Sequence, residues 1–224
     1  VVDATAPTLA IDPVSGGYIN NAEDESSLTV TGTSSGADGR TVTVNVGGLS
    51  KTATIASGGA WQVTLSSAEV KARSIGTVNI TADVSDTAGN AATQATGSYV
   101  YDITAPSLSI SSLFPTNDVT PLISGQAEAG ATVSVLIGGA TYTAARNGVG
   151  WSLDTGTASP ASGTMTLNLN GSNSVSVNAT DAAGNVGATV TGTLSIDTTA
   201  PTLAITPISG AYVNDAEDEN SLTI

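Results

Sequence analysis

The chain has 224 residues, and its 19 acidic and 5 basic side chains give it a net charge of −14. This charge disfavours a nucleic-acid partner and favours cations as ligands. The chain contains no Cys and no His, which excludes disulfides, thiolate or imidazole metal ligands and His-containing catalytic triads, so any metal must be a hard cation bound by oxygen atoms. No apolar run approaches the roughly 20 residues of a membrane helix, so we expect no membrane insertion.

A short linker phrase recurs three times along the chain. It reads Asp-Ala-Thr-Ala-Pro at 3–7, Asp-Ile-Thr-Ala-Pro at 102–106 and Asp-Thr-Thr-Ala-Pro at 197–201. The three prolines are 99 and 95 residues apart, which predicts tandem domains. Their expected bounds are 1–101, 102–196 and a partial third repeat, 197–224, with its first two strands only. Because Pro fixes φ and removes an amide donor, each phrase is expected to form a short, stiff joint.

Alternating polar and apolar residues predict β-strands throughout both complete repeats. In the first repeat, the strands are expected near residues 7–11, 27–33, 41–47, 50–56, 60–65, 76–84 and 91–101. In the second, they are expected near 107–111, 121–127, 131–137, 140–146, 149–153, 172–180 and 186–196. The predicted fold is therefore all-β: tandem immunoglobulin-like seven-stranded β-sandwiches arranged as an extended rod.

Local signals refine this fold. The pairs Gly47-Gly48 and Gly138-Gly139 stand between alternating runs, where glycines free to take a positive φ would close hairpins. We expect residues 67–74 to form a single helical turn, with Ser67 as its N-cap.

Trp61 and Trp151 open the fifth strand of each repeat. A Trp at matching places could be a platform on which a sugar stacks. Because burial of so large a ring dominates packing energetics, we interpret both residues as core fillers.

A second phrase recurs just before the last strand of each repeat. It is Asp-Thr-Ala-Gly-Asn at 86–90 and Asp-Ala-Ala-Gly-Asn at 181–185, and we call these segments the Asp-Gly-Asn loops. A turn explains the Gly and the Asn, since both residue types suit positive φ. It explains the leading Asp less well.

The order of strands in a sandwich brings these loops to the joints, because successive loops alternate between its two ends. The acidic loop of the first repeat (residues 20–25) should therefore meet the second linker and the second Asp-Gly-Asn loop. The oxygen donors expected at this first joint are Asn20, Asn21, Glu23, Asp24, Glu25, Asp102, Asp181 and Asn185. Carboxylates gathered in this way repel one another, and Ca²⁺, which takes six to eight oxygen ligands, would reverse the repulsion.

The other joints carry fewer candidate ligands. Upstream, Asp3, Asp86 and Asn90 would meet a preceding repeat. Downstream, Asn117, Asp118 and Asp197 would meet the third repeat, in which residues 212–219 copy the pattern of 18–25.

At these residues the chain resembles the bacterial immunoglobulin-like repeats of giant, type I-secreted (RTX-type) surface adhesins. The resemblance rests on the linkers, the Asp-Gly-Asn loops and the Asn-Ala-Glu sequence at 21–23, and it covers the whole chain. It implies a rod of many domains at the bacterial cell surface, secreted unfolded and folded outside the cell, with calcium at the interdomain joints. Matched residue by residue, it assigns metal binding to Asp3, Glu23, Asp86, Asp102, Asp181 and Asp197. The second repeat lacks the Asn-Ala-Glu motif between residues 111 and 121, which leaves binding at the second joint open.

The leading functional hypothesis is a structural spacer of an adhesin that serves cell adhesion, biofilm formation or virulence. Its partners would be calcium ions and the neighbouring repeats, with any host-cell or surface receptor bound by other domains. The alternative is a glycan- or receptor-binding module, which would need exposed aromatic platforms. An enzyme is not expected, since the carboxylates recur at joints instead of meeting in one cleft.

Overall fold

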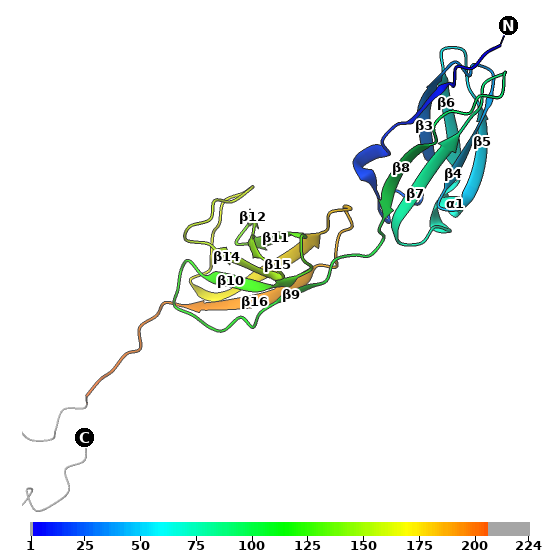
Figure 1. The fold of residues 1–224 in the computed structure, drawn as a ribbon. Coiled ribbons are helices and arrows are strands. Elements are labelled where there is room, and N and C mark those ends of the chain that lie inside the picture. The colour runs from blue at the N-terminus through cyan, green and yellow to red at the C-terminus, as the bar shows by residue number, and fades with distance from the viewer. Residues whose placement is uncertain (1, 206–224) are drawn as a thin grey trace, which may run out of the picture.

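The computed structural model describes residues 2–205, which form two β-sandwiches placed end to end (Figure 1). The two ends of the described chain lie at opposite ends of this elongated molecule. The all-β, rod-like fold is thus confirmed. Most of the predicted partial third repeat, 197–224, lies outside the described residues, and the predicted repeat bounds stay predictions. None of the helices within residues 2–205 has the length and apolar character needed to cross a membrane.

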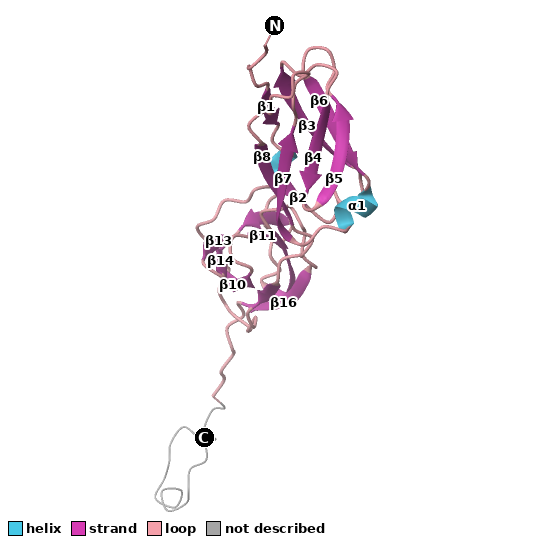
Figure 2. Ribbon diagram, turned by 45° about the vertical axis from the view of Figure 1, so that its right-hand side comes forward, coloured by secondary structure: helices cyan, strands magenta, loops and turns pink. Residues whose placement is uncertain are grey.

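The first sandwich contains a three-stranded and a five-stranded sheet (Figure 2). The smaller sheet has the order β1 (Thr8–Ile11), β3 (Leu28–Ser35), β6 (Ala60–Leu65). The larger has the order β2 (Tyr18–Ile19), β8 (Ala95–Tyr101), β7 (Gly76–Asp83), β4 (Thr41–Val46), β5 (Leu49–Thr54). All seven strands expected in this repeat are present, within a few residues of their predicted bounds.

The eighth strand, β2, was not predicted. A 3₁₀ turn, η1 (Ser15–Gly17), carries the chain from the β1 sheet to the opposite sheet, and Gly16 and Gly17 take φ values of 69° and 75° there. This conformation suits glycine, which has no Cβ. As a result β2 pairs with β8, the last strand, in parallel.

The second sandwich contains two four-stranded sheets. One has the order β13 (Ala145–Asn147), β14 (Gly150–Asp154), β10 (Leu122–Ala127), β9 (Leu108–Ile110). The other has the order β12 (Ala140–Thr143), β11 (Thr132–Ile137), β15 (Asn170–Thr180), β16 (Val190–Asp197). The strand predicted at 140–146 is divided, because β12 stays beside β11 whereas β13 crosses to β14.

Each sandwich has its own hydrophobic core, built mainly from the inward-facing Val and Ile residues of alternating strands. Trp61 and Trp151 are both 3% exposed, so the prediction that they are core residues is confirmed. Each ring packs on a glycine that sequence reasoning missed. A Cβ at Gly32 would lie 2.1 Å from the Trp61 ring, and one at Gly125 would lie 2.7 Å from the Trp151 ring.

The predicted turns are also present. Gly47, Gly48, Gly138 and Gly139 all have positive φ and close hairpins. Helix α1 (Ser67–Lys71) is a single short turn, as expected. Its N-cap is Ser66 and not Ser67, because Ser66 and Glu69 form a reciprocal capping box.

Candidate functional site at the joint between the sandwiches

The two Asp-Gly-Asn loops have one internal geometry. In the second loop, Asp181 Oδ1 accepts a hydrogen bond from Asn185 N at 2.8 Å, and Asp181 Oδ2 accepts one from Asn185 Nδ2 at 2.9 Å. In the first loop, Asn90 makes the same two bonds to Asp86, both at 2.8 Å. The bond from the Asn90 side chain is the main reason that the pKa of Asp86 lies below its usual value, although burial opposes it. The leading Asp of the phrase therefore holds the Asn in place.

The linker carboxylates form a second repeated arrangement. Asp3, Asp102 and Asp197 each accept, through Oδ1, the amide N–H of the Thr two residues later, at 3.0, 2.9 and 2.9 Å. These are Asx turns, which fix the course of the backbone. The side chain of Asn185 then donates to Asp102 O at 2.8 Å, and Asn90 donates to Asp3 O at 3.1 Å. Each Asp-Gly-Asn loop is thus tied to the linker that precedes its repeat.

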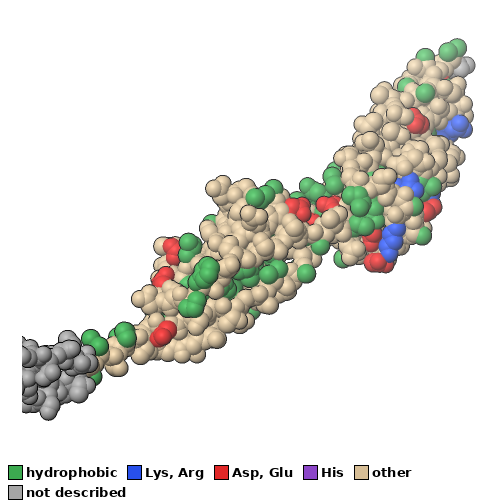
Figure 3. All heavy atoms as spheres, turned by 90° about the horizontal axis from the view of Figure 1, so that it is seen from below, with side chains coloured by type: hydrophobic (Ala, Val, Ile, Leu, Met, Phe, Trp, Pro, Cys, Tyr) green, Lys and Arg blue, Asp and Glu red, His purple; other side chains and the backbone are tan. Residues whose placement is uncertain are grey.

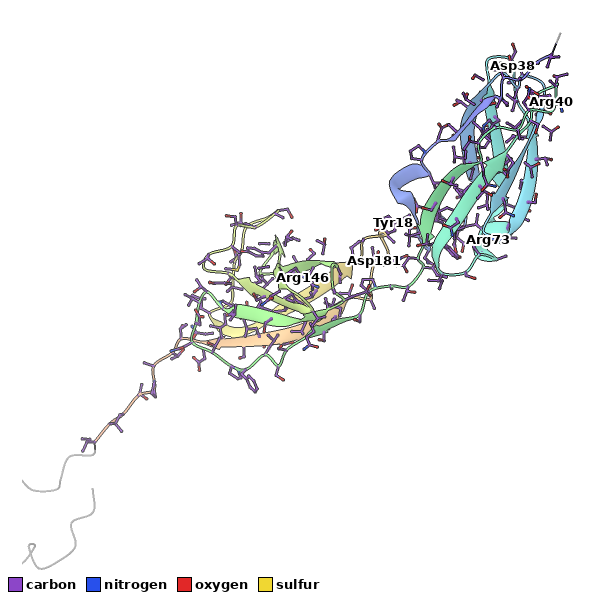
Figure 4. All side chains as sticks on the ribbon, viewed as in Figure 1. Tyr18, Asp38, Arg40, Arg73, Arg146 and Asp181 are labelled. Carbon is purple, nitrogen blue, oxygen red and sulfur yellow. The ribbon has the colours of Figure 1, made fainter. Side chains whose placement is uncertain are left out.

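The acidic loop of the first repeat contacts the second Asp-Gly-Asn loop across the joint. Asn20 Nδ2 donates to Ala183 O at 2.9 Å, and Asn21 N donates to Asn185 Oδ1 at 3.0 Å. Figure 4 shows the two facing ends, marked by Tyr18 just before the acidic loop and by Asp181. The predicted convergence of these loops is therefore observed. We call these two bonds the amide clasp.

The acidic loop is held in shape by its own side chains. Asn20 Oδ1 accepts the amides of Ala22 and Glu23, at 2.9 and 3.0 Å. Glu23 Oε2 accepts Asn20 N at 3.0 Å. Asn20 therefore uses its oxygen inside the loop and its amide nitrogen across the joint. Sequence reasoning treated Asn20 only as an oxygen donor and missed this second use.

Asp24 differs from the other acids because its side chain is buried, with 3% exposure. Its Oδ2 atom accepts the Tyr101 hydroxyl at 2.7 Å, and its Oδ1 atom is buried without a partner among the described residues. Burial, and then the hydrogen bond to Asp24, raise the pKa of Tyr101 to about 12. A buried carboxylate oxygen without a partner is costly, so we expect a water molecule or a cation to contact this atom.

The six carboxylates predicted to bind metal are distributed over three places. Asp3 and Asp86 lie at the outer end of the first sandwich, Glu23, Asp102 and Asp181 at the joint, and Asp197 at the end of β16. Between residues 2 and 205, no three His, Cys, Asp or Glu side chains lie close enough together to hold one metal ion. Acidic side chains are visible at the boundary between the two sandwiches in Figure 3.

The far end of the second sandwich repeats part of the joint. Thr116 pairs in parallel with Ile196 as Ile19 does with Tyr101. Asp197 N donates to Thr116 O at 2.9 Å, which matches the bond from Asp102 N to Ile19 O at 3.0 Å. Counting on from these pairs, Asn117 stands where the first repeat has Asn20.

The same alignment gives the remaining positions of the loop that follows Thr116 in the second repeat. Asp118 takes the place of Asn21, and Thr120 takes the place of Glu23. The second repeat therefore keeps the Asn of the amide clasp but has no carboxylate at the third position after it.

Comparison with known proteins connects this architecture to a family. Residues 114–198 match the family of bacterial Ig-like domains. No curated protein matches the chain. A solved structure from a 1.5-MDa bacterial ice-binding adhesin is 27% identical, with a TM-score of 0.52, and the match covers 87% of this chain and 65% of that one.

Two other solved structures also come from adhesins. One is a Ca²⁺-stabilized adhesin that helps an Antarctic bacterium to bind ice. It is 26% identical over 87% of this chain and 49% of that one, with a TM-score of 0.45. A bacterial Ig-like domain from the M. primoryensis ice-binding adhesin is 30% identical over 45% of this chain and 100% of that domain, with a TM-score of 0.35. The chain thus spans 65% and 49% of the length of the first two of these structures. Residues 114–198 therefore belong to the family of bacterial Ig-like domains, and the chain as a whole is similar to a large bacterial ice-binding adhesin.

Proposed function

We propose that this chain is a non-catalytic spacer of a bacterial cell-surface adhesin, and that its joint keeps two repeats at a fixed angle. The observation that carries the proposal is the amide clasp, in which the acidic loop of one repeat bonds to the Asp-Gly-Asn loop of the next. A joint that was only a tether would need no such complementary contacts.

The loop residues at the joint are more buried and more extensively hydrogen-bonded than a flexible linker requires. Ala183 and Asn185 are 8% and 5% exposed, although both lie in a loop at the end of a sandwich. Asn185 bonds at once to Asp181, to the Asp102 carbonyl group and to the amide of Asn21. One side chain therefore connects its own loop, the linker and the preceding repeat.

We further propose that Ca²⁺ stiffens this joint, with Glu23 and either Asp102 or Asp181 among its ligands. The candidate metal ligands at the joint are all oxygen atoms, because the chain has no Cys and no His. In addition, Asp24 Oδ1 is buried without a partner in the part of the chain that the structure describes. Both features suit a hard cation. Since no three carboxylates gather around one point there, main-chain carbonyl groups, amide oxygens and water must supply the remaining ligands. Bound calcium would neutralise the acidic loops, and the Ca²⁺-stabilized adhesin of an Antarctic bacterium is 26% identical to this chain.

Burial of the tryptophans weakens the rival interpretation. A glycan-binding module would need exposed aromatic rings on which sugars stack, and Trp61 and Trp151 are each 3% exposed. The structure therefore gives the rival no support from these two residues.

The proposal is tested by measuring the shape of the full chain in solution, by small-angle scattering, with calcium and with a chelator. The angle between the two sandwiches should have a narrow distribution with calcium and a wider one with the chelator. Circular dichroism should show that both sandwiches stay folded in either condition. Glu23→Gln should mimic the chelator. Asp38→Asn makes the same chemical change at the opposite end of the first sandwich and should have no effect (Figure 4).

Two results would contradict these statements separately. Scattering profiles that superimpose with and without calcium, together with no heat of calcium binding, would refute the calcium proposal. A broad distribution of angles in calcium would refute the fixed-angle spacer.

A further inference from the structure

The outer end of the first sandwich carries a finished copy of one half of the joint. Asn90 bonds to Asp86 and to Asp3 O as Asn185 bonds to Asp181 and to Asp102 O. Gly89 and Gly184 share their conformation, with φ values of 92° and 93°. The loop at 86–90 therefore takes its shape without any neighbouring repeat.

What differs between the two loops is their exposure. Ala183 is 8% exposed, whereas its counterpart Ala88 is exposed. A Cβ at Gly184 would lie 3.1 Å from Asn20 Nδ2, whereas a Cβ at Gly89 would meet nothing within 4 Å. The acidic loop covers the second Asp-Gly-Asn loop, and among the described residues no equivalent covers the first.

Specific acceptor atoms are left open by this difference. In the second loop, Asn185 Oδ1 accepts the amide of Asn21, and Ala183 O accepts the side chain of Asn20. In residues 2–205, no donor reaches the equivalent atoms Asn90 Oδ1 and Ala88 O. Two acceptors at a fixed spacing are thus presented on a rigid loop.

From this geometry we infer that the loop at 86–90 is a docking surface for the acidic loop of a preceding bacterial Ig-like repeat. The partner must present a side-chain amide followed by a free backbone N–H, which is what Asn20 and Asn21 supply. An Asp in place of the first Asn would set a carboxylate against the Ala88 carbonyl group. An Asn followed by a residue with a backbone N–H recurs in the sequence at 117–118 and at 214–215, as expected of a connector used more than once. This inference rests on the proposed spacer function and names the partner of a further joint.

The test adds a repeat to the full chain. A second copy of residues 1–101 is placed directly before Asp3, so that its Tyr101 precedes the Asp3 linker. The chain has no Cys, so nitroxide labels can be attached to introduced cysteines. One label replaces exposed Ser50 of the added copy and the other replaces exposed Ser98 of the original first repeat. The native joint is measured in the same way with the pair Ser50 and Thr193, where Thr193 is exposed and stands 95 residues after Ser98.

We expect double electron–electron resonance to give the new pair the same mean distance and the same narrow distribution as the native pair. Asn20→Asp in the added copy should raise the undocked fraction roughly thirtyfold, the effect expected when one amide hydrogen bond is lost and its buried acceptor is left unpaired. Gln62→Glu in the added copy makes the same amide-to-carboxylate change at an exposed position of β6 and should change nothing.

The inference is overturned if the new pair has a broad distribution or a different mean distance while the native pair stays narrow. It is also overturned if Asn20→Asp in the added copy leaves the distribution unchanged. A broad distribution at the native joint would be a separate result, since it refutes the fixed-angle spacer itself.

Discussion

Asn20→Asp should loosen the native joint without unfolding either sandwich. The substitution keeps the oxygen that accepts the amides of Ala22 and Glu23, so the acidic loop should keep its shape. It removes the amide nitrogen that donates to Ala183 O at 2.9 Å. The change therefore acts mainly on the contact between the repeats.

The size of the effect follows from the burial of the acceptor. Ala183 is 8% exposed, so its carbonyl group has little access to water as a replacement donor. Losing the bond and leaving this acceptor unpaired should cost the docked state about 2 kcal/mol. Since a difference of about 1.4 kcal/mol is tenfold, the undocked fraction should rise roughly thirtyfold.

The assay is the distance distribution between labels at Ser50 and Thr193. Asn20→Asp should broaden it, and Gln62→Glu, which makes the same amide-to-carboxylate change at an exposed position of β6, should not. Asn20→Ser separates the loss of the donor from the added charge, because serine is neutral and too short to reach Ala183. If both Asn20 variants keep the distribution of the unchanged chain, the amide clasp does not set the interdomain angle.

Four further predictions concern the sandwiches themselves. Gly125→Ala should destabilise the second sandwich by about 1 to 3 kcal/mol in thermal unfolding, because its Cβ would lie 2.0 Å from the Ser109 carbonyl oxygen. Trp151→Ala should cost about 3 to 5 kcal/mol and leave the unfolding of the first sandwich unchanged, since the cores are separate. The pKa of Asp86 is lowered from 3.8 on folding, so its stabilising contribution is complete above that pH and is lost as the pH falls through the folded value; denaturant titrations of Asp86→Asn should lack this part of the acid dependence. The pKa of Tyr101 is raised from 10.0 to about 12, so its contribution is complete below pH 10 and is lost towards pH 12, where tyrosinate absorbance should show a late-titrating group that is missing in Tyr101→Phe.

Most of the fold could be predicted from the sequence because its strands expose one face. Runs such as residues 41–46 alternate strictly, with Val buried and Thr exposed, and this period is visible without coordinates. The short β2 strand could not be predicted in this way, because two residues carry no period. Its position depends instead on the turn at Gly16 and Gly17 and on the partner strand β8.

The joint was predicted in its location but not in its chemistry. Alternation of loops between the two ends of a sandwich placed the acidic loop beside the second Asp-Gly-Asn loop. The acids themselves turned out to be occupied within their own segments: Asp181 by Asn185, Asp102 by Thr104 and Glu23 by Asn20. The bonds across the joint come from amides, and a sequence does not show which of two neighbouring polar side chains will turn outward. The six metal ligands stay a prediction.

The parallel pairing of β2 with β8 determines how a repeat would carry tension. Tyr18 lies opposite Val100 and Ile19 lies opposite Tyr101, so the strand near the start of the repeat runs alongside the last strand in the same direction. A pull on the two ends of the chain would slide these strands past each other, and the bonds between them would share the load instead of breaking one at a time. Thr116 and Ile196 pair in the same sense in the second sandwich. Lifetime under load is then governed by the rate of unfolding and not by the equilibrium stability, so two repeats of equal melting temperature can differ widely in the force they withstand.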